Sequence, residues 1–160
     1  MSLFGFWKKP QSFSRFTAIR AGRVELEGSI EALSTLPHPI TGEDCVALEY
    51  RALPPSMLSV HGVPHSSRAF TVEAAEARDF VLFDGQARVL VQVGDDQDDV
   101  LAVHEHLLEQ HGLRLQVEIA ALRPGMRARV LGRAELGHPG PAYRSIDYVA
   151  VIAAERFWQT

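Results

Sequence analysis

The chain contains a single cysteine, Cys45, and a thiol is one of the few side chains that can act as a nucleophile or a metal ligand. It does so as the thiolate, which requires a basic neighbour, a histidine partner or a helix N-terminus to lower its pKa. The neighbours of Cys45 are instead Glu43, Asp44 and Val46, and adjacent carboxylates disfavour the thiolate. We predict that Cys45 is a small buried or half-buried side chain at a barrel rim, at or near the entrance of a strand.

Histidines are the next candidates for chemistry. His104, His106 and His111 lie in a stretch of helical periodicity, and at 100° per residue His104 and His111 share the apolar face while His106 points elsewhere. The helical zinc signature would need a histidine at position 108, which is Leu108. The other histidines are turn or loop neighbours of proline: His38, His61, His65 and His138. We expect structural roles, with a metal site assembled from these loops as an alternative that elemental analysis for zinc would test.

Other catalytic patterns are absent from the sequence. It has no glycine-rich phosphate loop, no serine elbow motif and no Cys-x-x-Cys pair. The acidic run Asp95–Asp99 lacks the glycine and the terminal glutamate of a calcium loop, so it is not a typical calcium site. Low-affinity binding of calcium by its carboxylates is an alternative. We predict no catalytic residue, no metal ligand and no cofactor, and therefore a protein that is not an enzyme.

Composition and charge limit the classes of protein further. At 160 residues, 46% hydrophobic and 22% charged, the chain has the composition of an ordinary globular domain. Its net charge of −4 disfavours a surface built entirely for nucleic acid. One cysteine cannot form an internal disulfide, no apolar run approaches the roughly 20 residues that span a bilayer, and the N-terminus lacks the layout of a signal peptide. We expect a cytoplasmic protein.

The elements that must position these residues are mostly strands, because apolar and polar residues alternate along much of the chain. The expected strands cover residues 23–30, 46–52, 69–75, 80–93 as a hairpin around Asp84-Gly85, 126–136 and 143–157, with 115–122 ambiguous between strand and loop. Gly28 suggests a bend or bulge. Residues 98–111 carry apolar side chains at helical spacing, with Asp98 as the cap, and residues 54–69 have the composition of a long loop.

An oligonucleotide-binding (OB) barrel, a small, partly open Greek-key barrel, has this order of elements: several strands, one helix and then further strands. An antiparallel sandwich is the alternative, but it gives no reason for a single helix at that point. We predict a mainly β protein, an OB-fold-like β-barrel with one α-helix packed between strands. Residues 20–157 would form this single barrel domain, with the long loop at 54–69 and the helix at 98–111, and residues 1–19 would form an aromatic and basic N-terminal segment.

Four segments of the chain carry a resemblance to a known family: RVELEGSIEAL (residues 23–33), LPHPITGEDCVALEYRA (36–52), DFVLFDGQARVLVQV (79–93) and RPGMRARVLGRAEL (123–136). Together they resemble the GIDE domain, the β-rich "beside a membrane" module of organellar RING-type ubiquitin ligases. The second is the most specific, because a proline, a Thr-Gly pair and a Cys-Val pair precede a strand that contains tyrosine.

The resemblance implies a non-catalytic module that binds a protein partner beside a membrane. The family's ligases carry a RING with paired zinc-binding cysteines and histidines, whereas this chain ends at Thr160 with a single cysteine, so ligase activity is not carried over. The flanking transmembrane helices are absent too. No active-site residue is transferred, the partner is unidentified, and a homo-oligomer remains open.

A nucleic-acid-binding OB barrel is the alternative function. Arg127, Arg129 and Arg133 alternate along one outward strand face, with Arg123 just before them. Single-strand binders also need aromatic side chains on which bases stack, and the tyrosines of this chain mostly share faces with apolar residues. We expect a solvated strand face there. A binder would show steep salt dependence and would lose affinity when Arg127 and Arg129 are replaced.

The N-terminal segment is the part least typical of a core. It places aromatic side chains beside lysines: Phe4, Phe6, Trp7, Lys8 and Lys9. These side chains are candidates for binding a partner or a membrane surface through residues 1–16, which would make the protein peripheral to a membrane, although any membrane affinity would be weak and reversible. Docking of the aromatic side chains on the barrel or on a partner subunit is the alternative.

Overall fold

The structure is a computed structural model that describes residues 10–13, 15–53, 71–137 and 148–160. The predicted loop at 54–69 and the aromatic residues at the extreme N-terminus lie outside the described residues. The chain folds as two compact units. The first comprises the described parts of Met1–Glu31, Asp79–Gly94 and Gly125–Thr160, and the second those of Ala32–Arg78 and Asp95–Pro124.

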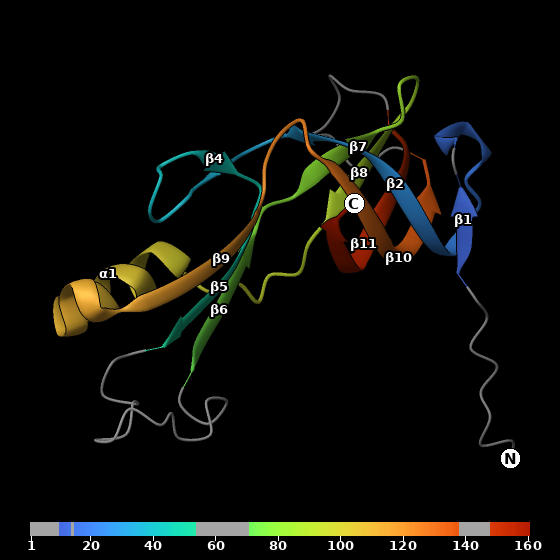
Figure 1. Ribbon diagram of the computed structural model, residues 1–160. Coiled ribbons are helices and arrows are strands. Elements are labelled where there is room, and N and C mark those ends of the chain that lie inside the picture. Colours follow the sequence, from blue (N-terminus) through green and yellow to red (C-terminus); the bar gives the residue numbers. More distant parts are fainter. Residues whose placement is uncertain (1–9, 14, 54–70, 138–147) are drawn as a thin grey trace, which may run out of the picture. The chain divides into compact units, whose positions relative to one another are not determined.

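The first unit is a closed five-stranded barrel (Figure 1). Its strands are β2 (Gly22–Ala32), β7 (Phe80–Phe83), β8 (Arg88–Gln92), β10 (Arg127–Leu136) and β11 (Tyr148–Gln159). They follow one another around the barrel in the order β2-β10-β11-β8-β7, and β7 returns to β2. Counted along the chain this order is 1-4-5-3-2, with β8 and β11 parallel, which is a Greek-key arrangement. The predicted mainly β fold, an OB-like barrel with one α-helix among the described residues, is confirmed, but the helix belongs to the second unit.

Two short elements precede the first barrel strand in the described part of the chain. β1 (Gln11–Phe13) pairs in parallel with β2, and the 3-10 turn η1 (Phe16–Ala18) follows. Phe16 is 1% exposed. Its ring lies so close to β2 that a Cβ added at Gly28 would be 3.0 Å from it and 2.8 Å from the Phe83 carbonyl oxygen. Gly28 is therefore required for close approach, and the β2–β10 register runs through it without a shift.

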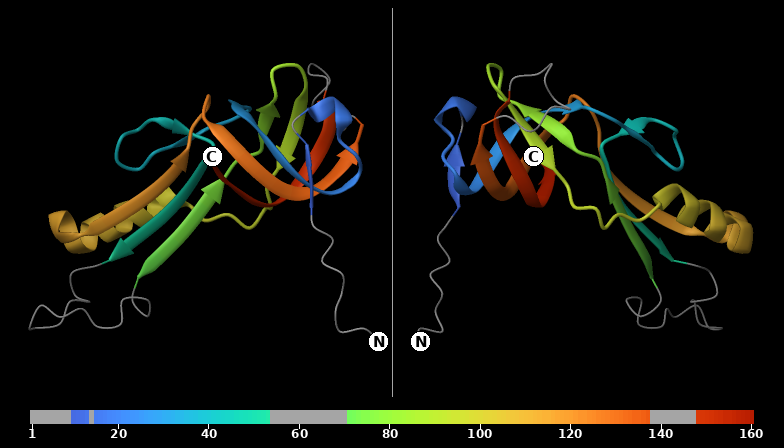
Figure 2. Two further views of the ribbon diagram at one scale, coloured as in Figure 1. Left: turned by 45° about the vertical axis from the view of Figure 1, so that its right-hand side comes forward. Right: turned by 180° about the vertical axis from the view of Figure 1, so that it is seen from behind.

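The barrel strands are bent where they pair with each other (Figure 2). The β10–β11 register shifts between Leu131 and Gly132, and a Cβ at Gly132 would collide with the carbonyl oxygen of Ala153. A bulge of this kind increases strand twist and helps a small barrel to close. Of the bend or bulge that the sequence suggests at Gly28, a bulge is absent from the β2–β10 pairing, whereas a register shift occurs at Gly132.

The second unit is a three-stranded antiparallel sheet with a helix against one face (Figure 1). The strands lie in the order β6 (Val72–Ala77), β5 (Ala47–Leu53), β9 (Gln116–Leu122), and a short hairpin of β3 (Leu36–Pro37) and β4 (Asp44–Cys45) precedes β5. The helix α1 (Val100–His111) continues into the 3-10 turn η4 (Gly112–Arg114). Side chains from the sheet, the hairpin and α1 form one apolar core.

The helix begins one residue later than its predicted cap. The side chain of Asp99, not Asp98, accepts a hydrogen bond from the Ala102 N–H at 3.0 Å. The Asp98 carboxylate instead accepts one from the Ala75 N–H at 2.9 Å. Either of two adjacent aspartates can cap a helix by its side chain. The contact of Asp98 with β6 therefore decides that Asp99 is the cap.

The prediction that residues 20–157 form one barrel needs correction. β5, β6 and β9 pair only with one another in the described residues, and their sheet is separate from the barrel. Their segments are inserted between β2 and β7 and between β8 and β10. The physical reason is that alternation of apolar and polar residues identifies a half-buried strand without naming its neighbours, so strands of two sheets read alike.

Candidate functional site

Cys45 lies in β4, where it is 0% exposed and pairs with Leu36. Its Sγ donates a weak hydrogen bond to the Glu43 carbonyl oxygen at 3.6 Å. Burial raises the pKa of the Cys45 thiol, an effect that the nearby Arg123 guanidinium opposes. A thiol with a raised pKa is a poor nucleophile and a poor metal ligand. The prediction of a buried side chain is confirmed, but Cys45 belongs to the second unit and does not lie at a barrel rim.

Two histidines are buried in the second unit. His104 is 5% exposed, and its Nδ1 shares a hydrogen bond of 2.8 Å with the hydroxyl of Tyr50. Burial lowers the pKa of His104 and raises the pKa of Tyr50, so both are neutral near neutral pH. His38 is 8% exposed, and its Nδ1 accepts hydrogen bonds from the backbone N–H groups of Ile40 and Thr41, both at 3.2 Å. These contacts fix ring orientation and leave the histidines in structural positions.

The remaining histidines do not join them. His106 is exposed and His111 is half-buried at the end of α1, whereas His61, His65 and His138 lie outside the described residues. Within the described part of the chain, no three side chains among His, Cys, Asp and Glu are placed to hold a metal ion.

The arginines of the alternative nucleic-acid face lie on the outer surface of β10. Arg127 and Arg129 both bind the Glu27 carboxylate of β2, at 3.2 Å and 2.9 Å. These hydrogen bonds lower the pKa of Glu27. Arg133 is exposed on the same strand, with Arg23 as its cross-strand neighbour. The carboxylate of Glu27 offsets much of the positive charge that a phosphate backbone would need.

OB barrels bind oligonucleotides on the face formed by their second and third strands, which here are β7 and β8. On the outer side of this hairpin Val81 pairs with Leu90, and together with Tyr148 they form a cluster that is 0–2% exposed. The partly buried Val151 packs against it. The surface on which bases would stack is therefore apolar and buried.

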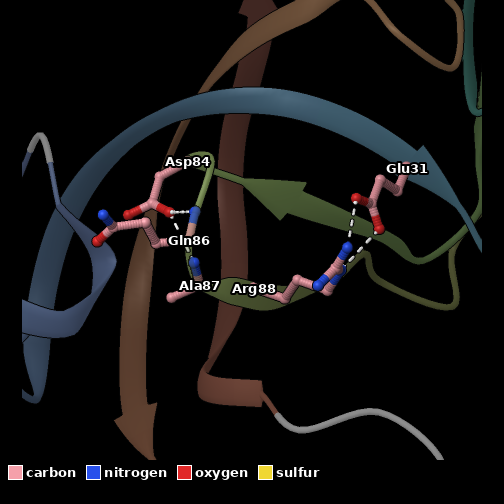
Figure 3. Close-up of polar contacts among 5 residues, drawn as sticks. All are labelled: Glu31, Asp84, Gln86, Ala87 and Arg88. Carbon is pink, nitrogen blue, oxygen red and sulfur yellow. Dashed lines mark hydrogen bonds and ion pairs between the residues drawn. The ribbon is translucent and has the colours of Figure 1, made fainter.

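The tip of this hairpin is held by polar contacts (Figure 3). The Arg88 guanidinium binds both oxygens of Glu31, at 3.0 Å and 3.2 Å, and lies 4.3 Å from the ring centroid of its cross-strand phenylalanine. At the turn, Asp84 Oδ1 accepts hydrogen bonds from the N–H groups of Gln86 and Ala87, at 2.8 Å and 2.7 Å. The Asp84 hydrogen bonds stabilise the predicted Asp84-Gly85 turn. The single arginine of the hairpin is bound to Glu31.

The sheet of the second unit has one covered face and one open face. Along β5, Leu48, Tyr50 and Ala52 point toward the core beneath α1 and are 0–3% exposed. Glu49 and Arg51 point to the opposite face and are exposed. We call this opposite face of β6, β5 and β9 the open face.

Two cross-strand rows make up the centre of the open face. The first row runs from Glu73 in β6 through Arg51 in β5 to Glu118 in β9. Arg51 binds Glu73 at 3.3 Å. All three side chains are exposed, so this row places two carboxylates around one guanidinium.

The second row has small side chains on both sides of its central residue. Glu49 lies between Ala75 of β6 and Ala120 of β9, whose short side chains leave space on both sides of the carboxylate. Asp98 borders the same space. The result is a shallow groove of about 550 Å³ along the open face, lined by four carboxylates and a single guanidinium. The groove is predominantly acidic and is lined by no histidine or cysteine.

Sequence reasoning did not find this groove. Glu49 and Arg51 were recognisable as the polar face of one strand, but the residues that complete the groove come from β6 and from β9, a segment of ambiguous sequence pattern. The predicted partner-binding residues Phe4, Phe6, Trp7, Lys8 and Lys9 lie outside the described residues. No helix in the described part of the chain is long and apolar enough to cross a bilayer.

A scan of the sequence against protein-family models finds no match, and a search of curated proteins finds none either. Function is therefore inferred from the geometry of the chain itself.

Proposed function

We propose that this chain is a non-catalytic protein-interaction module, and that its open face binds a positively charged segment of a partner protein. The observation that carries this proposal is the groove between β6, β5 and β9, with Glu49, Glu73, Glu118 and Asp98 around it and only Arg51 as a cation.

Charge complementarity favours a basic partner. Arg51 is already bound to Glu73, so the carboxylates of Glu49, Glu118 and Asp98 dominate the potential in the groove. Each exposed ion pair contributes about 0.2–1 kcal/mol, so ion pairs at these three carboxylates supply at most about 3 kcal/mol, and we expect weak binding in the millimolar range. Affinity of this origin falls as salt rises, since exposed charges are screened.

The GIDE-like motif supports the same assignment. Residues 36–52, which carry the most specific part of the resemblance, contribute β3, β4 and most of β5, the central strand of the open face. A role beside a membrane, through residues 1–16, and a relationship to the GIDE module are parts of this proposal.

A titration with a fluorescein-labelled oligolysine peptide tests the proposal. The full chain should bind it with an affinity that weakens on adding salt, and should not bind a matched oligoglutamate. Replacing Glu49→Gln and Glu118→Gln together should weaken binding about twofold to thirtyfold, from the loss of two exposed ion pairs.

The matched control is Glu135→Gln, which removes an exposed strand carboxylate from β10 of the barrel. It should leave the affinity unchanged. If Glu135→Gln combined with a second exposed barrel change, Glu155→Gln, weakened binding as much as the groove variant, net charge alone would explain the result and the proposal would fail. Tighter binding to a single-stranded oligonucleotide than to oligolysine would favour the OB-type alternative.

A further inference from the structure

The three-stranded sheet has two edges, one along β6 and one along β9 (Figure 1). A sheet edge exposes a row of backbone N–H and C=O groups that can pair with another strand. Proteins usually protect such edges with prolines, lysines, bulges or covering groups. The two edges of this sheet differ in that respect.

The β6 edge is closed by the segment that leads into α1. Ala75 donates its backbone N–H to the Asp98 carboxylate at 2.9 Å, and Ala77 donates its own to Gln97 Oε1 at 2.7 Å. The Asp98 N–H in turn donates to the Ala75 carbonyl oxygen at 3.0 Å. Two side chains and one backbone group therefore satisfy the C-terminal half of this edge.

The hydrogen-bonding direction of β9 follows from these contacts. Because alternate residues of an antiparallel strand bond to opposite neighbours, Ala75 and Ala77 bond outward and the residues between them bond to β5. Continuing across the register, Glu49 of β5 then bonds to Ala120 of β9. The residues of β9 whose N–H and C=O groups point to the outer edge are Val117, Ile119 and Ala121.

No strand pairs with the outer edge of β9 in the described part of the chain. β9 contains no proline and no lysine, and its register with β5 runs without a bulge. Its single charged residue, Glu118, points to the open face and not along the edge. The side chains at this margin are also incompletely covered: Val117 and Ile119 are half-buried, whereas their β5 partners Ala52 and Tyr50 are 0% and 1% exposed.

We propose that the outer edge of β9 pairs with the same edge of a second copy of the chain, antiparallel and with the two-fold axis at Ile119. This pairing would join two three-stranded sheets into one of six strands. It uses the backbone edge of β9, which borders the acidic groove, and does not depend on the proposed function.

The sequence of β9 is self-complementary in this register. Val117 bonds to Ala121 of the second copy, Ile119 to its own counterpart, and each such pair exchanges both N–H···O bonds. On the covered side of the sheet these apolar residues form a continuous row. On the open face Glu118 lies opposite Ala120 of the second copy, so no like charges are directly opposed.

Shifted registers fit less well. Sliding the second copy by two residues in one direction brings Glu118 opposite Glu118 of the second copy, which is destabilising. Sliding it the other way removes one of the bonding pairs at the centre of β9. A slip by one residue would place the outward N–H and C=O groups of β9 opposite residues of the second copy that bond to their own β5. It would also bring side chains of the covered face beside those of the open face. Only the register centred on Ile119 uses all three outward residues of β9.

Disulfide trapping tests this register. Glu118 and Ala120 of the second copy would form a non-hydrogen-bonded pair with Cα atoms about 4.5 Å apart, a separation that a disulfide can bridge. The full-length double variant Glu118→Cys with Ala120→Cys should form a covalent dimer under mild oxidation, while the native Cys45 stays buried. The matched variant Gln116→Cys with Glu118→Cys should not. Equal crosslinking of both variants, or none of either, would overturn the proposal.

Sedimentation velocity provides a second, independent test. The unmodified chain should shift from monomer to dimer between about 1 µM and 300 µM, whereas a monomer throughout would refute the pairing. Ile119→Pro removes an outward N–H from β9 and should abolish the dimer, because proline is tolerated at an edge whose N–H faces away from the sheet. Glu73→Pro removes an outward N–H from β6 and should leave the dimer intact. If Ile119→Pro fails to fold, the crosslinking result decides; if both proline variants dissociate equally, the β9 edge is not the interface.

Discussion

Replacing Tyr50 by phenylalanine removes one oxygen atom from the core of the second unit. That oxygen shares a hydrogen bond of 2.8 Å with Nδ1 of His104, and it is the only side-chain hydrogen bond that either residue makes in the described part of the chain. Tyr50 is 1% exposed and His104 5% exposed, so water cannot readily replace the lost partner. The phenylalanine ring keeps the shape of the site, which makes the change a test of the hydrogen bond and not of packing.

The magnitude follows from burial. Leaving a buried polar group without its partner costs about 1–3 kcal/mol. For a chain of 160 residues we expect Tyr50→Phe to lower the free energy of unfolding by this amount, and the melting temperature by about 2–10 °C. Urea unfolding followed by circular dichroism measures the first and calorimetry the second.

A double-mutant cycle separates the hydrogen bond from other effects. His104→Leu alone should destabilise the protein because it leaves the Tyr50 hydroxyl buried without a partner. In Tyr50→Phe with His104→Leu both polar groups are gone, so the double variant should be less destabilised than the sum of the two single changes. Additive losses, or a Tyr50→Phe variant within about 0.3 kcal/mol of the unmodified protein, would refute the reasoning.

The remaining predictions concern pH and close packing. Burial lowers the pKa of His104 in the folded protein below its usual value of 6.5. The unfolded state therefore binds a proton more readily than the folded state does. The stability contributed by the neutral ring is present above pH 6.5 and is lost as the pH falls through the pKa of the folded state. Urea midpoints should decline from about pH 6.5 to pH 5 in the unmodified protein and decline less in His104→Gln, and equal slopes would contradict this assignment. In the barrel, Gly28→Ala should destabilise by about 1–3 kcal/mol because the new Cβ would lie 2.8 Å from the Phe83 carbonyl oxygen, whereas Ala18→Gly in the exposed η1 turn should change the urea midpoint much less. A Gly28→Ala variant as stable as the unmodified protein would show that β2 can move away from Phe83 without cost.

Much of the local structure could be predicted from the sequence. The hairpin around Asp84-Gly85, the helix that ends before Gly112 and the burial of Cys45 all depend on residues within a few positions of one another. Turn formation, helix capping and the alternation of a strand are local effects, so nearby residues carry their signals. The class of fold, a β-barrel with one helix, followed from the order of these elements.

The pairing of strands could not be read in the same way. β5 and β10 both alternate apolar and polar residues, yet β10 belongs to the barrel and β5 to the separate sheet. The arginine face of β10 appeared basic in sequence because its partner, Glu27, lies about a hundred positions earlier in the chain.

By itself, the sequence determined most of the longer strands, the helix, and which side chains of each face a core, because these depend on periodicity over a few residues, whereas β9 was ambiguous and the short strands β1, β3 and β4 were not predicted. Only the tertiary structure decided that Glu49, Glu73 and Glu118 share one groove and that β9 lies at an edge. Those facts depend on which distant segments pair, and this is set by packing and hydrogen bonding summed over the whole sheet.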